Sequence, residues 1–228
     1  MDGQGNRTLL PGDLIYEDLN GDGLINQLDE KPIGYAEGAL PYLNYGINGR
    51  VTFKNISLAF DFAGAGMQTY YRDFELKYPF QNNGSSPAYM FDDHWHRSDP
   101  YNPNSEWIAG TYPAFRKDNN GLSVFRVPSA LSGNVPNRGA GDAPTFRNDF
   151  WTTNIRYLRL KNLELGYTFP QKLIKKVGAT ALRVYVNGTN LFSFDNVKEF
   201  QIDPEISSTN GLVYPQQKIY TFGFNLTL

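Results

Sequence analysis

One stretch of the sequence, residues 18–29, has oxygen-bearing side chains at the spacing of a calcium-binding loop. In such a loop, alternate residues of a tight turn point inward and supply the roughly six to eight oxygens that Ca²⁺ requires. Asp18, Asn20 and Asp22 fall at about the first, third and fifth positions, and Gly23 takes the position of the sharp turn. The spacing predicts one calcium ion with these ligands: the side chains of Asp18, Asn20, Asp22 and Asp29, the main-chain carbonyl of Leu24, and Asn26 directly or through water.

The segments on either side of this loop decide what a calcium ion could do there. An EF-hand sensor works by changing the angle between two helices that flank its loop. Here the preceding GDLIYED is short and strand-like, and Pro32 and two glycines in the following KPIGYAEG prevent a regular helix. Asp29 also stands where an EF-hand prefers a longer Glu, which favours weak binding. We therefore expect a structural ion rather than a switch; the alternative is an Asx- and Gly-rich turn that binds no metal.

No other set of residues indicates catalytic or cofactor chemistry. The sequence has no cysteine, which excludes disulfides, zinc ribbons and thiol nucleophiles. Its two histidines, His94 and His96, have no third ligand indicated beside them. The carboxylates show no pairing suited to glycoside hydrolysis, and most aromatic residues of the region 95–115 are expected to pack the chain rather than to stack on sugars. We expect no catalytic and no cofactor-binding residues, and an enzyme is the least favoured class of function.

The composition favours strands and turns. Of 228 residues, 15% are aromatic and 22 are Gly, whereas only 19% are charged, below the usual quarter. A net charge of −2 provides no basic surface for nucleic acid. No window approaches the ~20 apolar residues of a membrane-spanning helix. The residues after Met1 lack the apolar core of a secretory signal, which predicts a cytoplasmic protein or a piece of a longer precursor.

The clearest structural pattern is a β-hairpin over residues 43–62. The apolar residues occupy odd positions in 43–53 and even positions in 56–62. This switch is required if Lys54 and Asn55 form a two-residue turn, because Phe53 and Ile56 then lie opposite each other on one face. The same register predicts further positions: Val51 opposite Leu58, Ile47 opposite Phe62, and Arg50 and Asp61 on the other face.

Three more segments have the period of a strand. Residues 182–190 and 219–228 alternate cleanly, whereas 155–169 does so only from Leu163 onward. The irregular part predicts a bulge near Lys161-Asn162 or a strand that leaves the apolar zone. Each clean stretch is about the ~9–11 residues that a tilted strand needs to cross a bilayer.

Short and long connections alternate along the chain, as in outer-membrane barrels with short periplasmic turns and long extracellular loops. The aromatic residues Tyr42, Phe53, Tyr167, Phe169 and Tyr220 stand at the ends of the apolar face, where interfacial girdles would lie. We therefore predict an all-β, antiparallel, up-and-down transmembrane β-barrel segment. Its expected parts are an extracellular loop over 1–41, strands near 42–53, 56–66, 153–169, 181–193 and 216–228, and long extracellular loops over 71–152 and 196–214. The alternative is a secreted, calcium-stabilised β-sandwich that binds carbohydrate, which would alternate equally well.

Several segments resemble the end of the SusC/RagA family of TonB-dependent outer-membrane transporters from Bacteroidetes. They are PGDLIYEDLNGDGLI, YGINGRVTFKNISLAFDFAGAGMQ, YLRLKNLELGYTFP, LRVYVNGTNLFSF, DPE and YPQQKIYTFGFNLTL. HWHRSDPYNPNSEW followed by TYP also resembles a loop of that family, and the order of the blocks is preserved. Leu228 departs from the Phe with which such barrels usually end.

The resemblance implies more than the residues alone predict. Family members are longer, with a signal peptide, a plug domain and a barrel of about 22 strands, so the chain is expected to be a C-terminal fragment in the bacterial outer membrane. A SusD-like surface lipoprotein would cover the extracellular mouth and could meet the long loops. TonB would act through the plug, which this chain lacks. The substrate implied is a glycan or peptide oligomer, and the barrel wall would face outer-membrane lipid.

Overall fold

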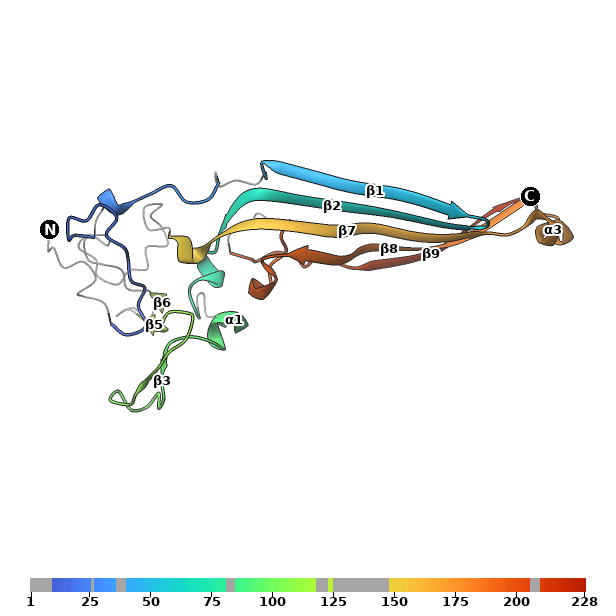
Figure 1. Ribbon diagram of the computed structural model, residues 1–228. Coiled ribbons are helices and arrows are strands. Elements are labelled where there is room, and N and C mark those ends of the chain that lie inside the picture. The colour runs from blue at the N-terminus through green and yellow to red at the C-terminus, as the bar shows by residue number, and fades with distance from the viewer. Residues whose placement is uncertain are drawn as a thin grey trace. The chain divides into compact units, whose positions relative to one another are not determined.

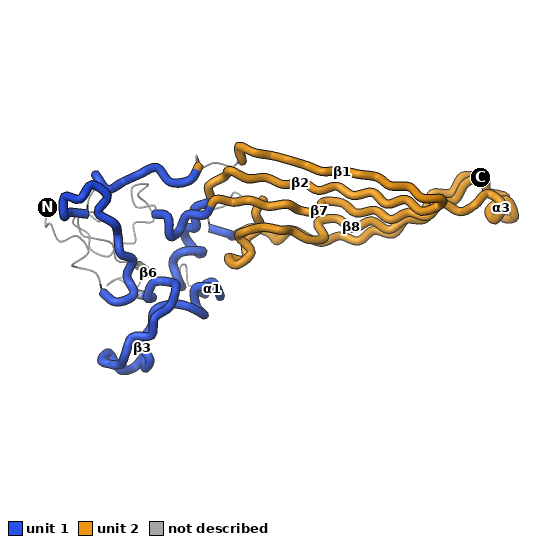
Figure 2. The backbone as a smooth tube through the Cα atoms, in the orientation of Figure 1, with its two compact units in different colours: residues 1–34, 70–153, 207–212 blue, residues 35–69, 154–206, 213–228 orange. Residues whose placement is uncertain are grey.

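The computed structural model describes residues 10–25, 27–35, 40–80, 85–117, 123–124, 148–205 and 210–228. The chain forms two compact units, shown in Figure 2. Unit 1 comprises residues 1–34, 70–153 and 207–212, and unit 2 comprises residues 35–69, 154–206 and 213–228. The residues before the first strand therefore share a compact unit with the long connection that follows the second strand, a grouping that the expected division at residue 41 did not include.

Unit 2 is built on an antiparallel sheet, which has five strands within the described residues (Figure 1). Its strands are β1 (Leu43–Phe53), β2 (Ile56–Tyr71), β7 (Thr152–Thr168), β8 (Ala181–Asp195) and β9 (Ile219–Thr227). Their order in the sheet, β1-β2-β7-β8-β9, is also their order in the sequence. Each strand thus pairs with its predecessor in the sheet, and the predicted all-β, antiparallel, up-and-down arrangement is confirmed.

The hairpin of β1 and β2 has the predicted register. Phe53 is paired with Ile56, and the further pairs are Val51 with Leu58, Ile47 with Phe62, Arg50 with Ala59 and Asn48 with Asp61. Lys54 has a φ of 54°, as the first residue of a mirror-image hairpin turn does. The turn therefore fixes which side chains share the apolar face, and a slip of one residue would exchange the two faces.

The irregularity predicted in the middle of β7 is a bulge. The pairing of β7 with β8 shifts between Leu160 and Asn162, so that Leu160 lies opposite Phe192 while Asn162 lies opposite Thr189. Asn190, within the shifted part of β8, has a φ of 54°, a conformation that Asn tolerates better than most residues. The bulge lets the chain change which positions face the apolar side, which explains why alternation fails before Leu163.

β2 continues to Tyr71 rather than ending near residue 66. Its last third lacks alternation because both faces are covered, and the residues from Gln68 to Tyr71 are all buried. Main-chain hydrogen bonds extend the strand: Tyr42 N–H donates to the Met67 carbonyl at 3.3 Å, and Arg72 N–H donates to the Trp151 carbonyl at 2.9 Å. The period-2 pattern detects a strand with one polar face, and it missed a strand end buried on both sides.

The connection between β7 and β8 is short and ordered. It contains α3 (Gln171–Ile174) and the 3₁₀-helix η7 (Lys175–Val177), and Gly178 ends them with a φ of 76°. A 3₁₀-helix, η8 (Lys198–Phe200), follows β8. Within the described residues, no helix has both the length and the apolar character needed to span a membrane.

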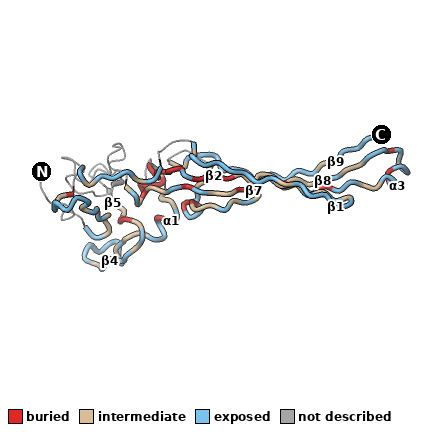
Figure 3. Tube along the Cα trace, turned by 45° about the horizontal axis from the view of Figure 1, so that its top comes forward, coloured by how far each residue is buried: buried red, intermediate tan, exposed pale blue. Residues whose placement is uncertain are grey.

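Unit 1 packs around an aromatic core that the sequence did not indicate. Tyr71, Tyr78, Met90 and Trp151 are buried together. The other elements of unit 1 are short: the 3₁₀-helices η2 (Gln27–Asp29), η3 (Phe74–Leu76) and η6 (Asp149–Trp151), the helix α1 (Ala88–Phe91), and the strand pairs β3 (His96–Arg97) with β4 (Trp107–Ile108) and β5 (Arg116–Lys117) with β6 (Ser123–Val124). Figure 3 shows buried residues near α1 and in the last part of β2, whereas β1 and β9 are exposed along most of their length.

Candidate functional site: the membrane-facing sheet and the calcium-type loop

The sheet carries one continuous apolar face. Phe222 of β9 is 80% exposed and Phe53 of β1 is 70% exposed. Between these strands the face contains a shallow, almost wholly apolar hollow, lined by Ile56, Leu165, Tyr167, Val184, Val186 and Phe222 among others. Soluble monomers rarely expose so large an apolar surface, whereas a strand that meets lipid must do so. This face is the lipid-contacting surface of a barrel wall.

Aromatic side chains mark both ends of the apolar face. At the end nearest the β1–β2 turn, the ring centroids of Tyr167 and Phe169 lie 5.0 Å apart in an edge-to-face contact. Phe53, the last residue of β1, directly precedes this turn. At the other end, Tyr42 and Tyr220 are exposed. The sequence assigned these residues to interfacial girdles, where an amphipathic ring has its apolar body in lipid and its hydroxyl group in water, and that assignment stays a prediction.

The opposite face of the sheet is polar and internally paired. Arg183 forms an ion pair with Glu164 at 2.6 Å and donates to the Ser57 hydroxyl at 3.3 Å. Gly166 makes room for this contact, because a Cβ there would lie 2.3 Å from the Arg183 guanidinium. The sequence placed Arg183 on this face but gave no partner for it, since the partners lie on other strands.

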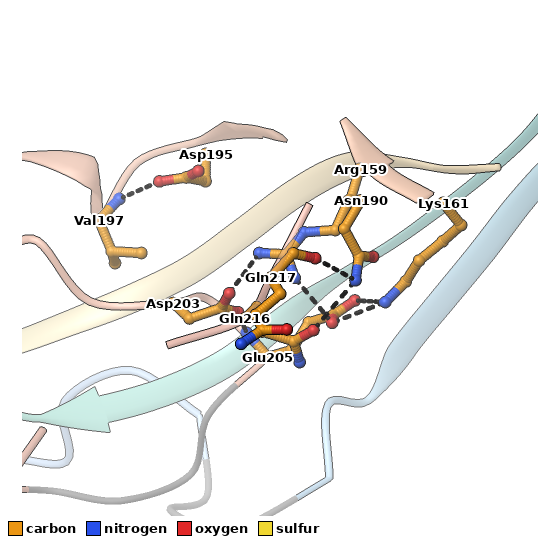
Figure 4. Close-up of polar contacts among 9 residues, drawn as sticks. All are labelled: Arg159, Lys161, Asn190, Asp195, Val197, Asp203, Glu205, Gln216 and Gln217. Atoms are coloured by element: carbon orange, nitrogen blue, oxygen red, sulfur yellow. Dashed lines mark hydrogen bonds and ion pairs between the residues drawn. The ribbon is translucent and has the colours of Figure 1, made fainter. Parts of the chain in front are cut away.

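A denser ion cluster lies further along the same strands (Figure 4). Arg159, which is 5% exposed, contacts Asp203 at 2.7 Å and Glu205 at 2.9 Å. Lys161 contacts Glu205 at 2.7 Å. Arg159 and Lys161 are two residues apart on β7, which places both cations on one side. Their contacts with Asp203 and Glu205 attach the connection between β8 and β9 to the sheet. Sequence reasoning missed it, although the DPE segment that contains Asp203 and Glu205 was already part of the family resemblance.

The calcium-type loop is closed by hydrogen bonds from its own main chain. The Asp18 carboxylate accepts from the N–H groups of Gly21 and Gly23, both at 2.7 Å. Gly21 and Gly23 have φ values of 74° and 82°, which few other residues adopt. Asp29 accepts the Leu19 N–H at 2.9 Å and so draws the end of the loop back to its start.

The predicted ligand side chains lie in one loop, where they form hydrogen bonds with one another and with the main chain. Asn20 donates from its amide nitrogen to Asp22 at 3.1 Å, and Asp22 accepts the Leu24 N–H at 2.8 Å. In the described part of the chain, no three His, Asp or Glu side chains are grouped as a metal site would need. Asn26 lies outside the described residues. Calcium binding therefore stays a prediction, for which the folded loop supplies the right donor atoms.

The charged residues buried in unit 1 support its core. The Lys77 ammonium donates to the Tyr71 hydroxyl at 2.6 Å and lies 5.0 Å from the centre of the Tyr78 ring. Burial lowers the pKa of Lys77 to about 8, an effect that Asp73 opposes. Burial also raises the pKa of Tyr89 to about 12. Phe115 also packs against this core, and the His94 ring stacks on the Phe115 ring with 4.0 Å between their centroids.

The comparisons with known proteins agree with this geometry. The chain is 28% identical to TonB-dependent receptor P3 of Formosa agariphila and 26% identical to TonB-dependent receptor P26 of the same organism, over 95% of its length in both cases. It spans about a fifth of the length of these relatives. No family model matches it. A solved structure of the RagAB peptide transporter has the same fold over 84% of the chain and 18% of its own chain, with a TM-score of 0.52 and 20% identity.

These findings define the class first: the sheet is part of the wall of a β-barrel in the bacterial outer membrane. The chain is related to the TonB-dependent receptors of Bacteroidetes, and the resemblance to the SusC/RagA family that its motifs indicated is confirmed. The relatives are named as receptors, and none is named as an enzyme. The β-sandwich alternative is not favoured, because its apolar face would be covered rather than exposed.

Proposed function

We propose that this chain forms part of the barrel wall of a TonB-dependent outer-membrane transporter, with a role in transport rather than catalysis. The observation that carries the proposal is the pairing of an exposed apolar face with a polar face on the same strands. The apolar face suits lipid, and the polar face, with its Arg183–Glu164 pair, suits a hydrated lumen through which a solute passes.

The substrate proposed is an oligomer, either a glycan or a peptide. The RagAB structure is described as a peptide transporter, and this supports a peptide as one of the two classes. The partners proposed are a SusD-like surface lipoprotein at the extracellular mouth and TonB, which would act through a plug domain elsewhere in the receptor. The residues that contact substrate would lie on loops of this chain and on that plug.

Uptake by the full-length receptor tests the proposal. A strain that lacks the receptor gene should lose growth on one class of oligomer, peptides or glycans, and keep growth on the corresponding monomers. Complementation with the full-length gene should restore growth, and complementation with a form that lacks the segment contacting TonB should not. Growth of the deletion strain on every oligomer at the wild-type rate would contradict a transport role.

We also propose that residues 18–29 hold one structural calcium ion through Asp18, Asn20, Asp22 and Asp29 with the Leu24 carbonyl. The folded loop supports this, because Asp18 orders the turn through the Gly21 N–H and Asp29 draws the end of the loop back to Leu19. The Asn20 amide would have to turn its oxygen toward the ion. If the loop is extracellular, as the order of the strands predicts, a Kd of about 10⁻⁴–10⁻³ M would keep the site occupied.

Asp22→Ala is expected to make this loop sensitive to protease even in millimolar calcium, because it removes a central ligand. The wild-type receptor should be protected by calcium and lose that protection in a chelator, while barrel assembly stays unchanged in both proteins. Asp13→Ala, a carboxylate just outside the loop, is the matched control. Equal cleavage of the wild-type loop with and without calcium would show that the turn binds no metal.

A further inference from the structure

A small hairpin of unit 1 presents an isolated tyrosine at its tip. The arms are β3 (His96–Arg97) and β4 (Trp107–Ile108), and the tip contains Tyr101. Tyr101 is 95% exposed, the highest value among the large apolar and aromatic residues of the described part of the chain. Figure 1 shows the hairpin extending away from α1 and from the pair of strands β5 and β6. Such exposure of an aromatic ring calls for an explanation beyond packing.

The backbone of the tip is fixed by its own side chains. Asp99 accepts the Tyr101 N–H at 2.9 Å, and Asn102 accepts the Asn104 N–H at 3.0 Å. The Ser105 hydroxyl lies within hydrogen-bond distance of the carbonyls of Asp99 (2.9 Å) and Asn102 (2.8 Å). The tip is therefore held in one conformation before any contact is made, and little entropy would be lost on binding.

Contacts along the two arms connect the ordered tip to the aromatic core of unit 1. The Arg97 guanidinium stacks over the Trp107 ring at 4.3 Å and donates to the Ser105 carbonyl. Below it, Trp95 N–H donates to the Tyr112 carbonyl at 2.9 Å, and the Tyr112 ring packs against the core of unit 1. The tyrosine is thus the end of a braced element rather than of a loose loop.

The chemistry of the tip favours a protein as its partner. Sites for small ligands are concave, whereas this ring projects. The side chains beside it, Asp99, Asn102 and Ser105, form hydrogen bonds with the main chain of the tip itself. The acidic residues of the region, among them Asp92, Asp93 and Glu106, would repel the phosphates of a lipid surface. A projecting, rigid tyrosine suits a pocket on another protein, where Tyr is among the residues that contribute most to binding.

We propose that the hairpin 96–108 is a preformed docking element for the surface lipoprotein, and that Tyr101 inserts into a pocket of that lipoprotein. The inference rests on the proposed function, in which the lipoprotein is a partner. What it adds is the residue, Tyr101, that makes the contact. Asp99 is a positioning residue, since it acts by holding the Tyr101 main chain. Asx and Pro residues around the ring make the tip stiff, as in other loops that present aromatic anchors.

Co-purification of the full-length receptor with the lipoprotein encoded beside it tests this inference. Tyr101→Ala should reduce the amount of lipoprotein retained by at least tenfold, and Asp99→Ala should reduce it by a smaller factor. Leu173→Ala is the matched control, because Leu173 is also a large exposed apolar residue, at 56%, but lies in α3, in the short connection between β7 and β8. It should retain the lipoprotein fully. Heat-modifiable gel migration would verify that each barrel is assembled.

A photo-reactive phenylalanine analogue at position 101 gives a second measurement. It should cross-link to the lipoprotein, while the same analogue at position 173, in the short connection between β7 and β8, should not. Full retention of lipoprotein by Tyr101→Ala, or cross-linking at 101 to lipopolysaccharide or to sugar alone, would overturn the docking role and leave the transport proposal intact. A wild-type receptor that purifies without any lipoprotein would overturn the docking role and the proposed lipoprotein partner, whereas the transport proposal would still be decided by the growth experiment.

Discussion

Phe222→Arg is expected to prevent assembly of the full-length receptor in the outer membrane, whereas Thr221→Arg, one residue away, is expected to be tolerated. Phe222 lies opposite Val186 on the apolar face, and Thr221 lies opposite Asn187 on the polar face. An arginine on the lipid side near the middle of the bilayer costs roughly 2–4 kcal/mol. On the polar side the same guanidinium would stay in water.

Heat-modifiable gel migration of the full-length receptor measures this difference. Val184→Arg is a second substitution of the lipid-facing set and should behave as Phe222→Arg does, because Val184 lines the same apolar hollow. Asn187→Arg provides a second control on the polar face, in the strand that neighbours Thr221. If all four variants assembled as fully as the wild-type receptor, neither face of the sheet would meet lipid.

The sheet could be predicted from the sequence wherever one face is apolar and the other polar. In β1 and β2 the parity switch across Lys54-Asn55 determined the register, because a strand's side chains alternate strictly. The bulge near Lys161 was predicted for the same reason, since a failure of alternation needs a local cause. The end of β2, buried on both faces, gave no such signal.

Unit 1 could not be predicted because its contacts are neither periodic nor local. Trp151 and Tyr71 are far apart in the sequence but belong to the same buried cluster, and no repeating pattern of residues predicts such a contact. The hairpin that carries Tyr101 has arms of two residues each, too short for a period to be read. The calcium-type loop is the opposite case, since its spacing of Asx and Gly is local and the predicted turn is present.

Ion pairs between distant segments likewise could not be predicted from the sequence. The pairs of Arg159 with Asp203 and Glu205 lead to a prediction with a large expected effect. Arg159→Ala is expected to release the connection between β8 and β9 from the sheet. The substitution leaves Asp203 and Glu205, both mostly buried, without the cation that lies between them. Breaking a buried ion pair by removing one partner costs about 3–5 kcal/mol, and the remaining contact of Lys161 with Glu205 would recover only part of it.

Hydrogen exchange and limited proteolysis of residues 196–205 and 210–218 in the assembled receptor would measure the release. Arg159→Lys should give an intermediate result, because one ammonium cannot replace the two guanidinium nitrogens that contact the two carboxylates. Arg183→Ala is the matched control: it breaks the more exposed pair with Glu164, which joins two strands of the sheet and holds no connection. Its effect on these residues should be small.

Combining Arg159→Leu with Asp203→Asn and Glu205→Gln separates charge from packing. If the cost of Arg159→Ala arises from carboxylates left without a counter-charge, neutralising them should restore much of the protection. The charge that remains in the cluster, on Lys161, is on a side chain that is 30% exposed. If the triple variant remains as open as Arg159→Ala, the guanidinium acts through its packing and its directed hydrogen bonds instead. Unchanged protection in Arg159→Ala itself would show that the connection is held by other contacts, and that the cluster contributes no net stability to it.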